Sequence, residues 1–411
     1  MEKKEIVLGN SIRKEKIVIG GKAEEKEVYR ININNLFYND ENGRIATFMA
    51  EYNSTHSTPI SSLSFEEYNN VIMDYVKKSG SPAKYKTTKD NIASLGQLKT
   101  GIILEDGRVI DGNRRFTCLR ELYEETKKEK YMYFECFVLK MPKTKEDRIA
   151  IKTLELNYQF GEDQREDYNP IDRLVDIYRD LVGPEKMFTE KEYLERVNGM
   201  IKKSELQLSI EKAKTLHDYL EFIGMPERWD IARDYKLDGP IQEIANKRKK
   251  LGETSDEWME MAPTLYSFLK QACADNSKGD KTREIRKVIK IYDNNPDEFK
   301  RLSEKMFDIA MRTETVDDIS DSVIRKQEQT RLVQDLYKLD SDVTQAYTRI
   351  GNESAKNKNI KVFEDVEKKL SEFDKVLVHR STGDKLEELE RKIADVENII
   401  FKIKEEIKNA K

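Results

Sequence analysis

The sequence predicts an α+β protein with a small mixed sheet near its N-terminus and helices over nearly all the rest. Short β-rich runs alternate with helical patterns over the first third of the chain, at Val28–Ile33, Gly101–Leu104, Arg108–Ile110 and Tyr131–Leu139. From about Lys143 onward, apolar residues recur almost only at helical spacing. The tail carries a strict a/d repeat, so we expect a final coiled-coil helix.

Changes in pattern divide the 411 residues into five expected segments, because the chain is longer than a typical single domain. We expect an irregular leader over residues 1–26 and a mixed-sheet domain over 27–142. A helical domain with helix-turn-helix proportions follows over 143–226. A helical domain of unassigned role over 227–350 and a helical, coiled-coil tail over 351–411 complete the chain.

Composition excludes several classes of protein. The 74 basic and 78 acidic residues give a net charge of −4, so nucleic acid would have to meet local basic patches rather than a global basic field. The three cysteines and three histidines have no metal-ligand spacing, which argues against a zinc site. No apolar run approaches membrane-spanning length, and the first residues lack an apolar signal segment. We expect a cytoplasmic protein without a membrane partner.

The stretch from residue 101 to 122 combines a hairpin, a glycine turn and the start of a helix. Asp106-Gly107 favours a tight turn between two β-rich runs. Gly112 stands between strand and helix, where a ligand can approach the backbone closely and free N–H groups attract an anion. Arg114 and Arg115 would oppose the helix dipole unless an anion compensated them, and phosphate fits. An ordinary hairpin with two surface arginines would give the same short pattern.

The helical half contains two further candidate binding regions. Thr189 and Glu192 form a capping box, and Asn198-Gly199 separates that short helix from Ser204–Leu220, as in a helix-turn-helix. Phe188–Leu220 holds six basic and six acidic residues, which indicates weak DNA binding or a protein-binding role. A helix near residues 280–292 carries a basic stripe, for which a solvated helix face is the alternative interpretation: Arg283, Arg286, Lys287 and Lys290.

The tail predicts helix pairing. Its apolar residues alternate three and four apart over about three heptads, at Leu386, Leu389, Ile393, Val396, Ile400, Ile403 and Ile407. Such a seam pairs with a second subunit or with another helix of the same chain, and we expect a homodimer.

The first half of the chain resembles the ParB family, whose N-terminal domain shares its fold with sulfiredoxin. Five segments resemble family motifs in the family's order, and together they span about residues 28–225: Leu36–Arg44, Asn91–Leu98, Asp111–Arg115, Leu154–Ile171 and Phe188–Leu220. Glu155 and Asn157 stand where the family has an adjacent Glu-Asn pair.

The resemblance implies particular roles for these residues. In the ParB family the arginine motif binds the triphosphate of a nucleotide, commonly CTP, while the Glu-Asn segment helps hold Mg²⁺ and support hydrolysis, and the helix-turn-helix binds DNA. It implies metal-binding and catalytic roles for Glu155 and Asn157. The implied phosphate contacts are Arg44, Gly112, Asn113, Arg114, Arg115 and Arg165. The expected DNA contacts are Lys202, Lys203 and Lys212, with the stripe Arg283, Arg286, Lys287 and Lys290.

Three functional hypotheses follow. The first is a ParB-like DNA-binding protein of a bacterium or mobile element, of the partition or regulation type, that binds CTP or ATP with Mg²⁺ and dimerises through its tail. The second is an NTP-dependent phosphoryl-transfer enzyme or nuclease on the same scaffold. The third is a protein-binding adaptor that does not bind DNA. Whether the nucleotide is hydrolysed stays open at this point.

Overall fold

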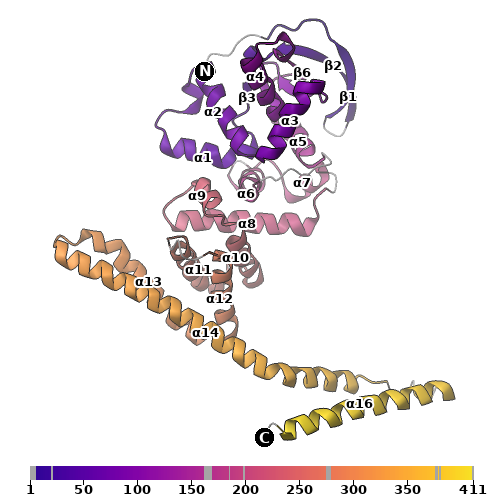
Figure 1. The fold of residues 1–411 in the computed structure, drawn as a ribbon, viewed down its shortest axis with the longest axis vertical. Coiled ribbons are helices and arrows are strands. Elements are labelled where there is room, and N and C mark those ends of the chain that lie inside the picture. Colours follow the sequence, from indigo (N-terminus) through magenta and orange to yellow (C-terminus); the bar gives the residue numbers. More distant parts are fainter. Residues whose placement is uncertain are drawn as a thin grey trace. The chain divides into compact units, whose positions relative to one another are not determined.

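The structure is a computed structural model, and it forms two compact units, Met1–Thr344 and Gln345–Lys411, which are described separately (Figure 1). The described residues are 6–19, 22–161, 169–184, 186–197, 200–274, 279–374, 378 and 381–409.

The first unit contains a six-stranded mixed sheet, as the sequence predicts (Figure 1). Its strand order is β1-β2-β6-β4-β5-β3. β6 lies between β2, to which it is antiparallel, and β4, to which it is parallel. β4 and β5 form the expected antiparallel hairpin, and β3 pairs with β5 in parallel. The strands are β1 (Arg13–Ile19), β2 (Lys22–Asn32), β3 (Phe37–Tyr38), β4 (Gly101–Leu104), β5 (Arg108–Asp111) and β6 (Tyr133–Leu139).

The expectation of an irregular leader over residues 1–26 is wrong from Arg13 onward. β1 and β2 pair antiparallel from Arg13 opposite Val28 to Ile19 opposite Lys22. β1 is rich in lysine, arginine and glutamate, and Ile17 is its one residue among the buried hydrophobic residues of the described chain. Charged side chains are typical of an edge strand, where they discourage pairing with other chains. Because of these charges, β1 lacks the apolar alternation by which a strand is recognised in a sequence.

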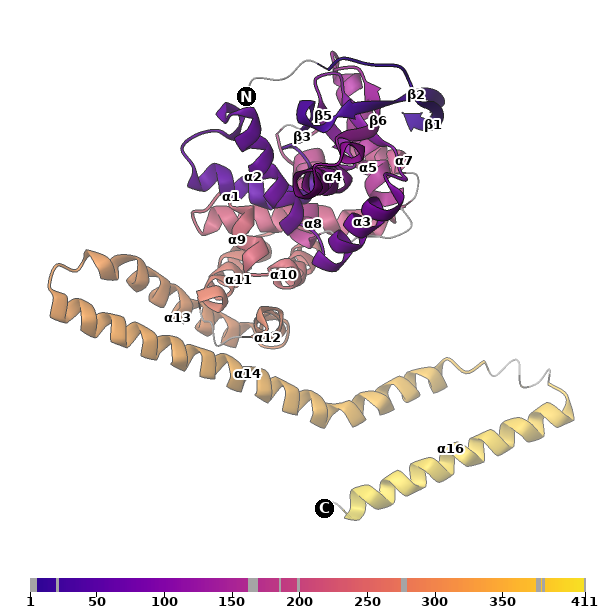
Figure 2. The same cartoon turned by 45° about the horizontal axis from the view of Figure 1, so that its top comes forward.

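Two hydrophobic layers enclose the sheet. Phe116 of α4 and Phe134 of β6 belong to the larger cluster, which also contains Ile72 of α2 and Ile92 of α3. On the other face, Leu154 of α5 joins a smaller cluster with residues of β1, β2, β4, β5 and β6. α4 packs against α2 and α3 (Figure 2). The helices here are α1 (Ala46–Thr55), α2 (Phe65–Lys78), α3 (Pro82–Leu95), α4 (Asn113–Thr126) and α5 (Lys145–Gly161).

Local signals place several of these helices correctly. Ser64 and Glu67 predict a capping box that opens a helix to about Lys78, and α2 begins after Ser64 and ends at Lys78. α3 ends before Gly96, whose φ of 79° ends the helix as the sequence suggests. The basic composition of Lys84–Lys89 predicts a loop, and this prediction is wrong, because these residues lie within α3. Pro82 at the first helical position starts α3 earlier than the lysine-rich composition indicates.

Every element described after β6 is helical, in agreement with the sequence. α6 begins at Pro170 and continues directly into a π-helix, Tyr178–Val182, and α7 starts with the predicted Thr189–Glu192 capping box. None of the described helices combines the length and apolar composition needed to cross a membrane. These helices are α6 (Pro170–Ile177), α7 (Glu190–Arg196), α8 (Lys203–Phe222), α9 (Trp229–Asp234), α10 (Asp238–Leu251), α11 (Asp256–Ala274), α12 (Lys281–Asn294), α13 (Pro296–Thr315), α14 (Ser322–Ser371) and α16 (Gly383–Asn409).

Candidate functional site

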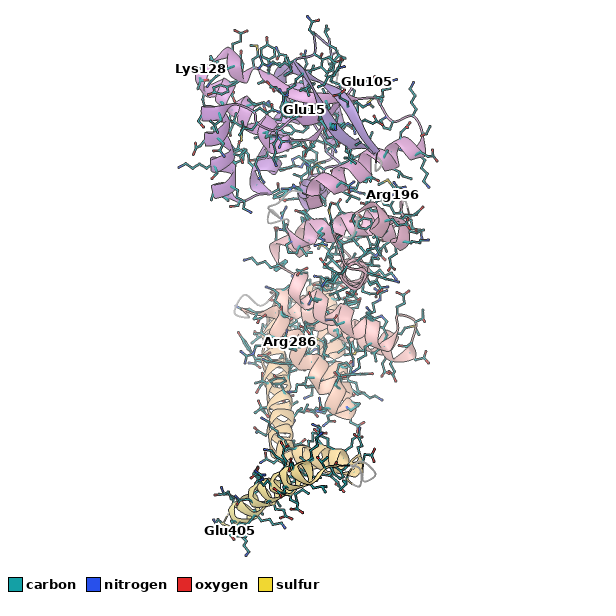
Figure 3. The ribbon with its side chains drawn as sticks, turned by 90° about the vertical axis from the view of Figure 1, so that its right-hand side faces the viewer. Glu15, Glu105, Lys128, Arg196, Arg286 and Glu405 are labelled. Carbon is teal, nitrogen blue, oxygen red and sulfur yellow. The ribbon has the colours of Figure 1, made fainter. Side chains whose placement is uncertain are left out.

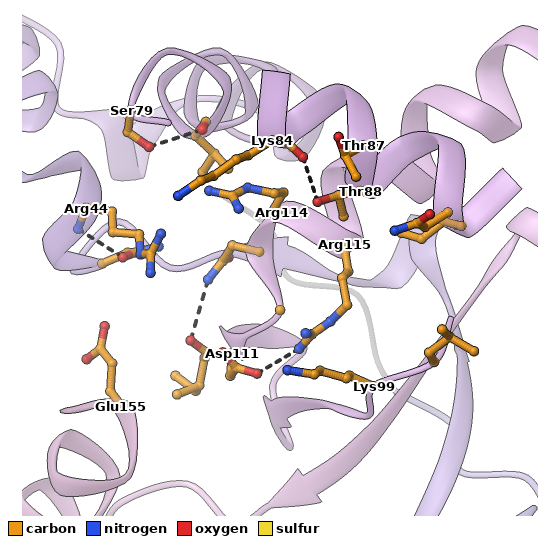
Figure 4. A pocket seen from close by; sticks show the side chains of 18 of the residues that line it. Arg44, Ser79, Lys84, Thr87, Thr88, Lys99, Asp111, Arg114, Arg115 and Glu155 are labelled. Atoms are coloured by element: carbon orange, nitrogen blue, oxygen red, sulfur yellow. Dashed lines mark hydrogen bonds and ion pairs between the residues drawn. The ribbon is translucent and has the colours of Figure 1, made fainter. Parts of the chain in front are cut away.

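A pocket of about 600 Å³ lies at the N-terminus of α4 (Figure 4). Segments far apart in the sequence form its walls: the short 3-10 helix Gly43–Ile45, the C-terminal end of α2, α3 with the loop after it, the β5–α4 turn, and α5. Two carboxylates line it, from Asp111 and Glu155. Five basic side chains line it as well, from Arg44, Lys84, Lys99, Arg114 and Arg115.

The turn into α4 requires glycine. Gly112 has φ of 92°, in the left-handed region that other residues rarely adopt. A Cβ atom here would lie 2.9 Å from Cζ of Phe134 and 3.0 Å from Nη2 of Arg115. Gly112 supplies no side-chain cap to α4, and a helix N-terminus of this kind, which faces a pocket, suits an anion.

The two arginines of the turn have different neighbours. Nη2 of Arg115 donates to Oδ2 of Asp111 at 2.8 Å, which joins the end of β5 to the first turn of α4 (Figure 4). The guanidinium of Arg114 lies beside Gly80, where a Cβ atom would be 3.0 Å from Nη2. Gly80 lies between α2 and α3, so its missing side chain leaves room for Arg114 at that wall of the pocket.

Asn42 and Asn113 both line the pocket. Oδ1 of Asn42 accepts the N–H of Arg44 at 3.1 Å and so fixes the backbone that carries this arginine. Nδ2 of Asn113 donates to the carbonyl of Ile110 at 3.5 Å. Oδ1 of Asn113 is buried and accepts no hydrogen bond from the described part of the chain. This oxygen is a free acceptor in the pocket wall, suited to a donor on a ligand or to a cation.

The contribution of α3 to the pocket was not predicted from the sequence. Lys84, Thr88 and Asn91 follow helical spacing, and all three line the pocket together with Thr87. Oγ1 of Thr88 donates to the carbonyl of Lys84 at 2.9 Å, which leaves the lone pairs of the hydroxyl for a ligand. The helical spacing of Lys84, Thr88 and Asn91 could have indicated this face, but the basic composition of the segment suggested a loop instead of a helix.

Glu155 and Asn157 do not come together in the pocket. Both lie on α5, but residues two apart on a helix point to different sides. Glu155 lines the pocket and Asn157 does not. The described residues hold no group of three or more acidic, histidine or cysteine side chains that suits a metal. Of the two expected metal ligands, only Glu155 lines the pocket, and a single carboxylate suits Mg²⁺ when ligand phosphates supply most of its oxygens.

A buried charge cluster lies behind Glu155. Nζ of Lys152 lies 3.5 Å from Glu155, 3.7 Å from Asp176 and 3.6 Å from Asp180, and Arg179 pairs with both aspartates. Burial raises the pKa of Glu155 and of Asp180. Burial alone would lower the pKa of Lys152, but the carboxylates outweigh it and raise that pKa. The cluster ties α5 to α6 and the π-helix.

α6 also holds α1, the helix that follows Arg44. Oδ1 of Asp172 accepts the N–H of Thr47 at 2.9 Å, in the first turn of α1. Arg233 of α9 also contacts α1, since it pairs with Glu51 at 2.8 Å. Asp172, Asp176 and Asp180 recur every four residues along an apolar segment, a signal that could have identified this buried face.

The expected DNA-binding residues are spread over two helices, α8 and α12, with α10 packed against both. Lys202 and Lys203 are exposed at the start of α8, but Lys212 pairs with Asp238 at 2.5 Å. Arg286 is exposed on α12 (Figure 3). It pairs with Glu243 at 2.6 Å, and Lys287 pairs with Glu284 at 2.9 Å. Arg283 is exposed, and Lys290 lies on the same helix. The pairing of these cations favours the solvated-face interpretation of the stripe.

The pocket brings together five of the six expected phosphate contacts, namely Arg44, Gly112, Asn113, Arg114 and Arg115. The sixth, Arg165, lies outside the described residues. No family model, curated protein or solved structure matches this chain. The chemistry of the pocket therefore carries the inference of function.

Proposed function

We propose that the pocket binds the phosphates of a nucleoside triphosphate and that the chain is a ParB-like nucleotide-binding protein. One observation carries the proposal. Arg44 and the Gly112–Arg115 turn, expected to act together on sequence grounds alone, line the same pocket at a helix N-terminus. An ordinary hairpin with two surface arginines gives no reason for Arg44 to lie there.

The charge of the pocket supports a polyanionic ligand. Five basic side chains and two carboxylates leave an excess of three positive charges, in a chain whose net charge is −4. A concave, locally cationic site concentrates anions. Arginine forks and helix N–H groups suit phosphate oxygens. A volume of about 600 Å³ also leaves room for a nucleoside beside the phosphates.

The geometry supports binding more directly than hydrolysis. Bound Mg²⁺ would offset phosphate charge, and Glu155 is the described residue placed to assist it. Asn157, the second expected catalytic residue, is outside the pocket lining. Three of the seven expected DNA-binding cations, Lys212, Arg286 and Lys287, are engaged in ion pairs, which weakens the case for DNA as the ligand.

Calorimetry with CTP, ATP and GTP in the presence of Mg²⁺ tests the proposal on the full chain. Arg114→Ala is the informative variant, because replacing Arg115 would also leave Asp111 without its ion pair. Loss of charge-assisted hydrogen bonds of about 1.5–3 kcal/mol should raise Kd about tenfold to a hundredfold. Arg148→Ala is the matched control, since Arg148 is exposed on α5 and does not line the pocket.

Two results would overturn the proposal. The first is wild-type protein that binds none of the three nucleotides below millimolar concentration. The second is an equal loss of affinity in Arg114→Ala and Arg148→Ala, which would show that the charge of the whole protein, and not the pocket, attracts the ligand.

A further inference from the structure

α16, described by itself, presents an unpartnered apolar stripe. None of its residues is buried, and Ile393, Val396 and Ile407 are 50%, 42% and 52% exposed. These residues belong to the a/d seam that runs from Leu386 to Ile407. An amphipathic helix of 27 residues gains most of its stability from covering such a stripe.

The charges beside the stripe indicate what covers it. With Leu386 at an a position, the first two g positions that flank the seam carry Lys385 and Lys392, and the first two e positions carry Glu390 and Glu397. In a parallel coiled coil each g residue faces the e residue of the next heptad on the other helix. Lys385 therefore meets Glu390 of a second copy, and Lys392 meets Glu397, each twice in a dimer.

The antiparallel arrangement is less favourable. Antiparallel helices place g beside g and e beside e. At full overlap, Lys385 would face Glu406 of the other copy, which is attractive. Glu390 would face Glu397, which is repulsive. The parallel register has only attractive charge pairs. Within one helix, Lys392 has a weak contact of 3.7 Å with the exposed Asp395, and the pairing replaces it at little cost.

We propose that α16 binds a second copy of this chain as a parallel, in-register coiled coil whose register is set by Lys385–Glu390 and Lys392–Glu397 pairs between the copies. The proposal is independent of the nucleotide pocket, because it rests on the tail alone.

Cross-linking of the full chain tests the direction of the helices. Leu386→Cys places identical thiols side by side in the parallel register. In the antiparallel arrangement each thiol faces the region of Ile403, about 25 Å along the helix from its twin. A bis-maleimide shorter than that span should link Leu386→Cys into a species of twice the chain mass. Arg391→Cys, on the outer face, is the control and should stay unlinked beyond the wild-type background from Cys273.

Charge reversal tests the register. Lys385→Glu with Lys392→Glu replaces four attractive contacts in the dimer by repulsive ones, and the Kd of self-association should rise about tenfold. Adding Glu390→Lys and Glu397→Lys should restore the wild-type Kd, because the reversed pairs attract again in the parallel register only. Light scattering that shows monomeric wild type, or a fourfold variant as weak as the twofold one, would overturn the proposal.

Discussion

At the residue scale, the position of Gly112 excludes other residues for two reasons, its backbone conformation and its close packing. Its φ of 92° is costly for any residue with a side chain, and a Cβ atom would also meet Phe134 and Arg115. Gly224 has a similar φ of 71°, but no atom lies within 4 Å of where its Cβ atom would be. A substitution at Gly224 therefore tests the backbone conformation alone. The two glycines therefore separate the cost of backbone conformation from the cost of close packing.

We expect Gly224→Ala to lower the free energy of unfolding by about 1–2 kcal/mol, the usual cost of a left-handed alanine. Gly112→Ala should cost about 1–3 kcal/mol more, because core residues must shift to admit the extra methyl group. Urea denaturation of both variants measures the difference. Equal losses of unfolding free energy in the two variants would mean that Phe134 and Arg115 move aside for the extra methyl group without strain.

Single residues also show what the sequence could predict of the candidate site. The Gly112–Arg115 turn could be predicted from the local sequence, because a strand, a glycine and a helix follow one another within a few residues. Lys99 and Asn42 gave no comparable local signal, since only the tertiary fold brings their segments to the turn. The long-range part of the pocket was therefore predictable only at Arg44 and Glu155, through a family resemblance.

At the element scale, α6 connects the sheet domain to the rest of the first unit through buried carboxylates. Burial raises the pKa of Asp172 to about 7, against an ordinary value of 3.8, although its bond to Thr47 opposes the shift. Asp176 adds to the increase and Arg233 reduces it. The folded protein thus keeps a proton on Asp172 at pH values where the unfolded chain has lost it.

Asp172 therefore stabilises the folded protein more at acidic pH than at neutral pH. The contribution of Asp172 to the free energy of unfolding is fully present below about pH 4 and is lost as pH rises toward 7. Asp172→Asn stays neutral and can still accept the N–H of Thr47. Its stability relative to wild type should rise by about 1.4 kcal/mol per pH unit across this range and level off above pH 7. Urea titrations at pH 5, 6, 7 and 8 measure it, and a difference independent of pH would contradict the prediction.

Elements were predictable where capping chemistry marks their ends. Ser64 with Glu67 and Thr189 with Glu192 set the starts of α2 and α7, because each pair satisfies the free N–H groups of its own helix. β1 was missed because pairing with β2, rather than apolar alternation, makes it a strand. Tertiary contacts override composition in that segment.

At the scale of the whole molecule, the pocket and the a/d seam belong to different units. The pocket lining ends at Glu155, within the unit Met1–Thr344, and α16 lies in the unit Gln345–Lys411. Binding of nucleotide and self-association should therefore be separable by truncation.

A chain that stops at Gly351, after the buried Ala346 and Ile350, should keep the nucleotide affinity of the full chain and lose self-association. Calorimetry measures the affinity, and light scattering measures the mass. A truncated chain that folds but no longer binds nucleotide would show that the tail contributes to the pocket, and a truncated chain that still self-associates would place the seam elsewhere.

The strand order has a consequence for the way the chain acquires its structure during synthesis. β6 is the last strand to be made, yet it lies between β2 and β4. Until Leu139 has left the ribosome, β1–β2 and β4–β5 can form only as separate hairpins, each with an open edge where β6 belongs. The nascent N-terminal third of the chain thus depends on a single late strand to join its two hairpins, and its exposure to aggregation and to chaperones is greatest just before that strand emerges.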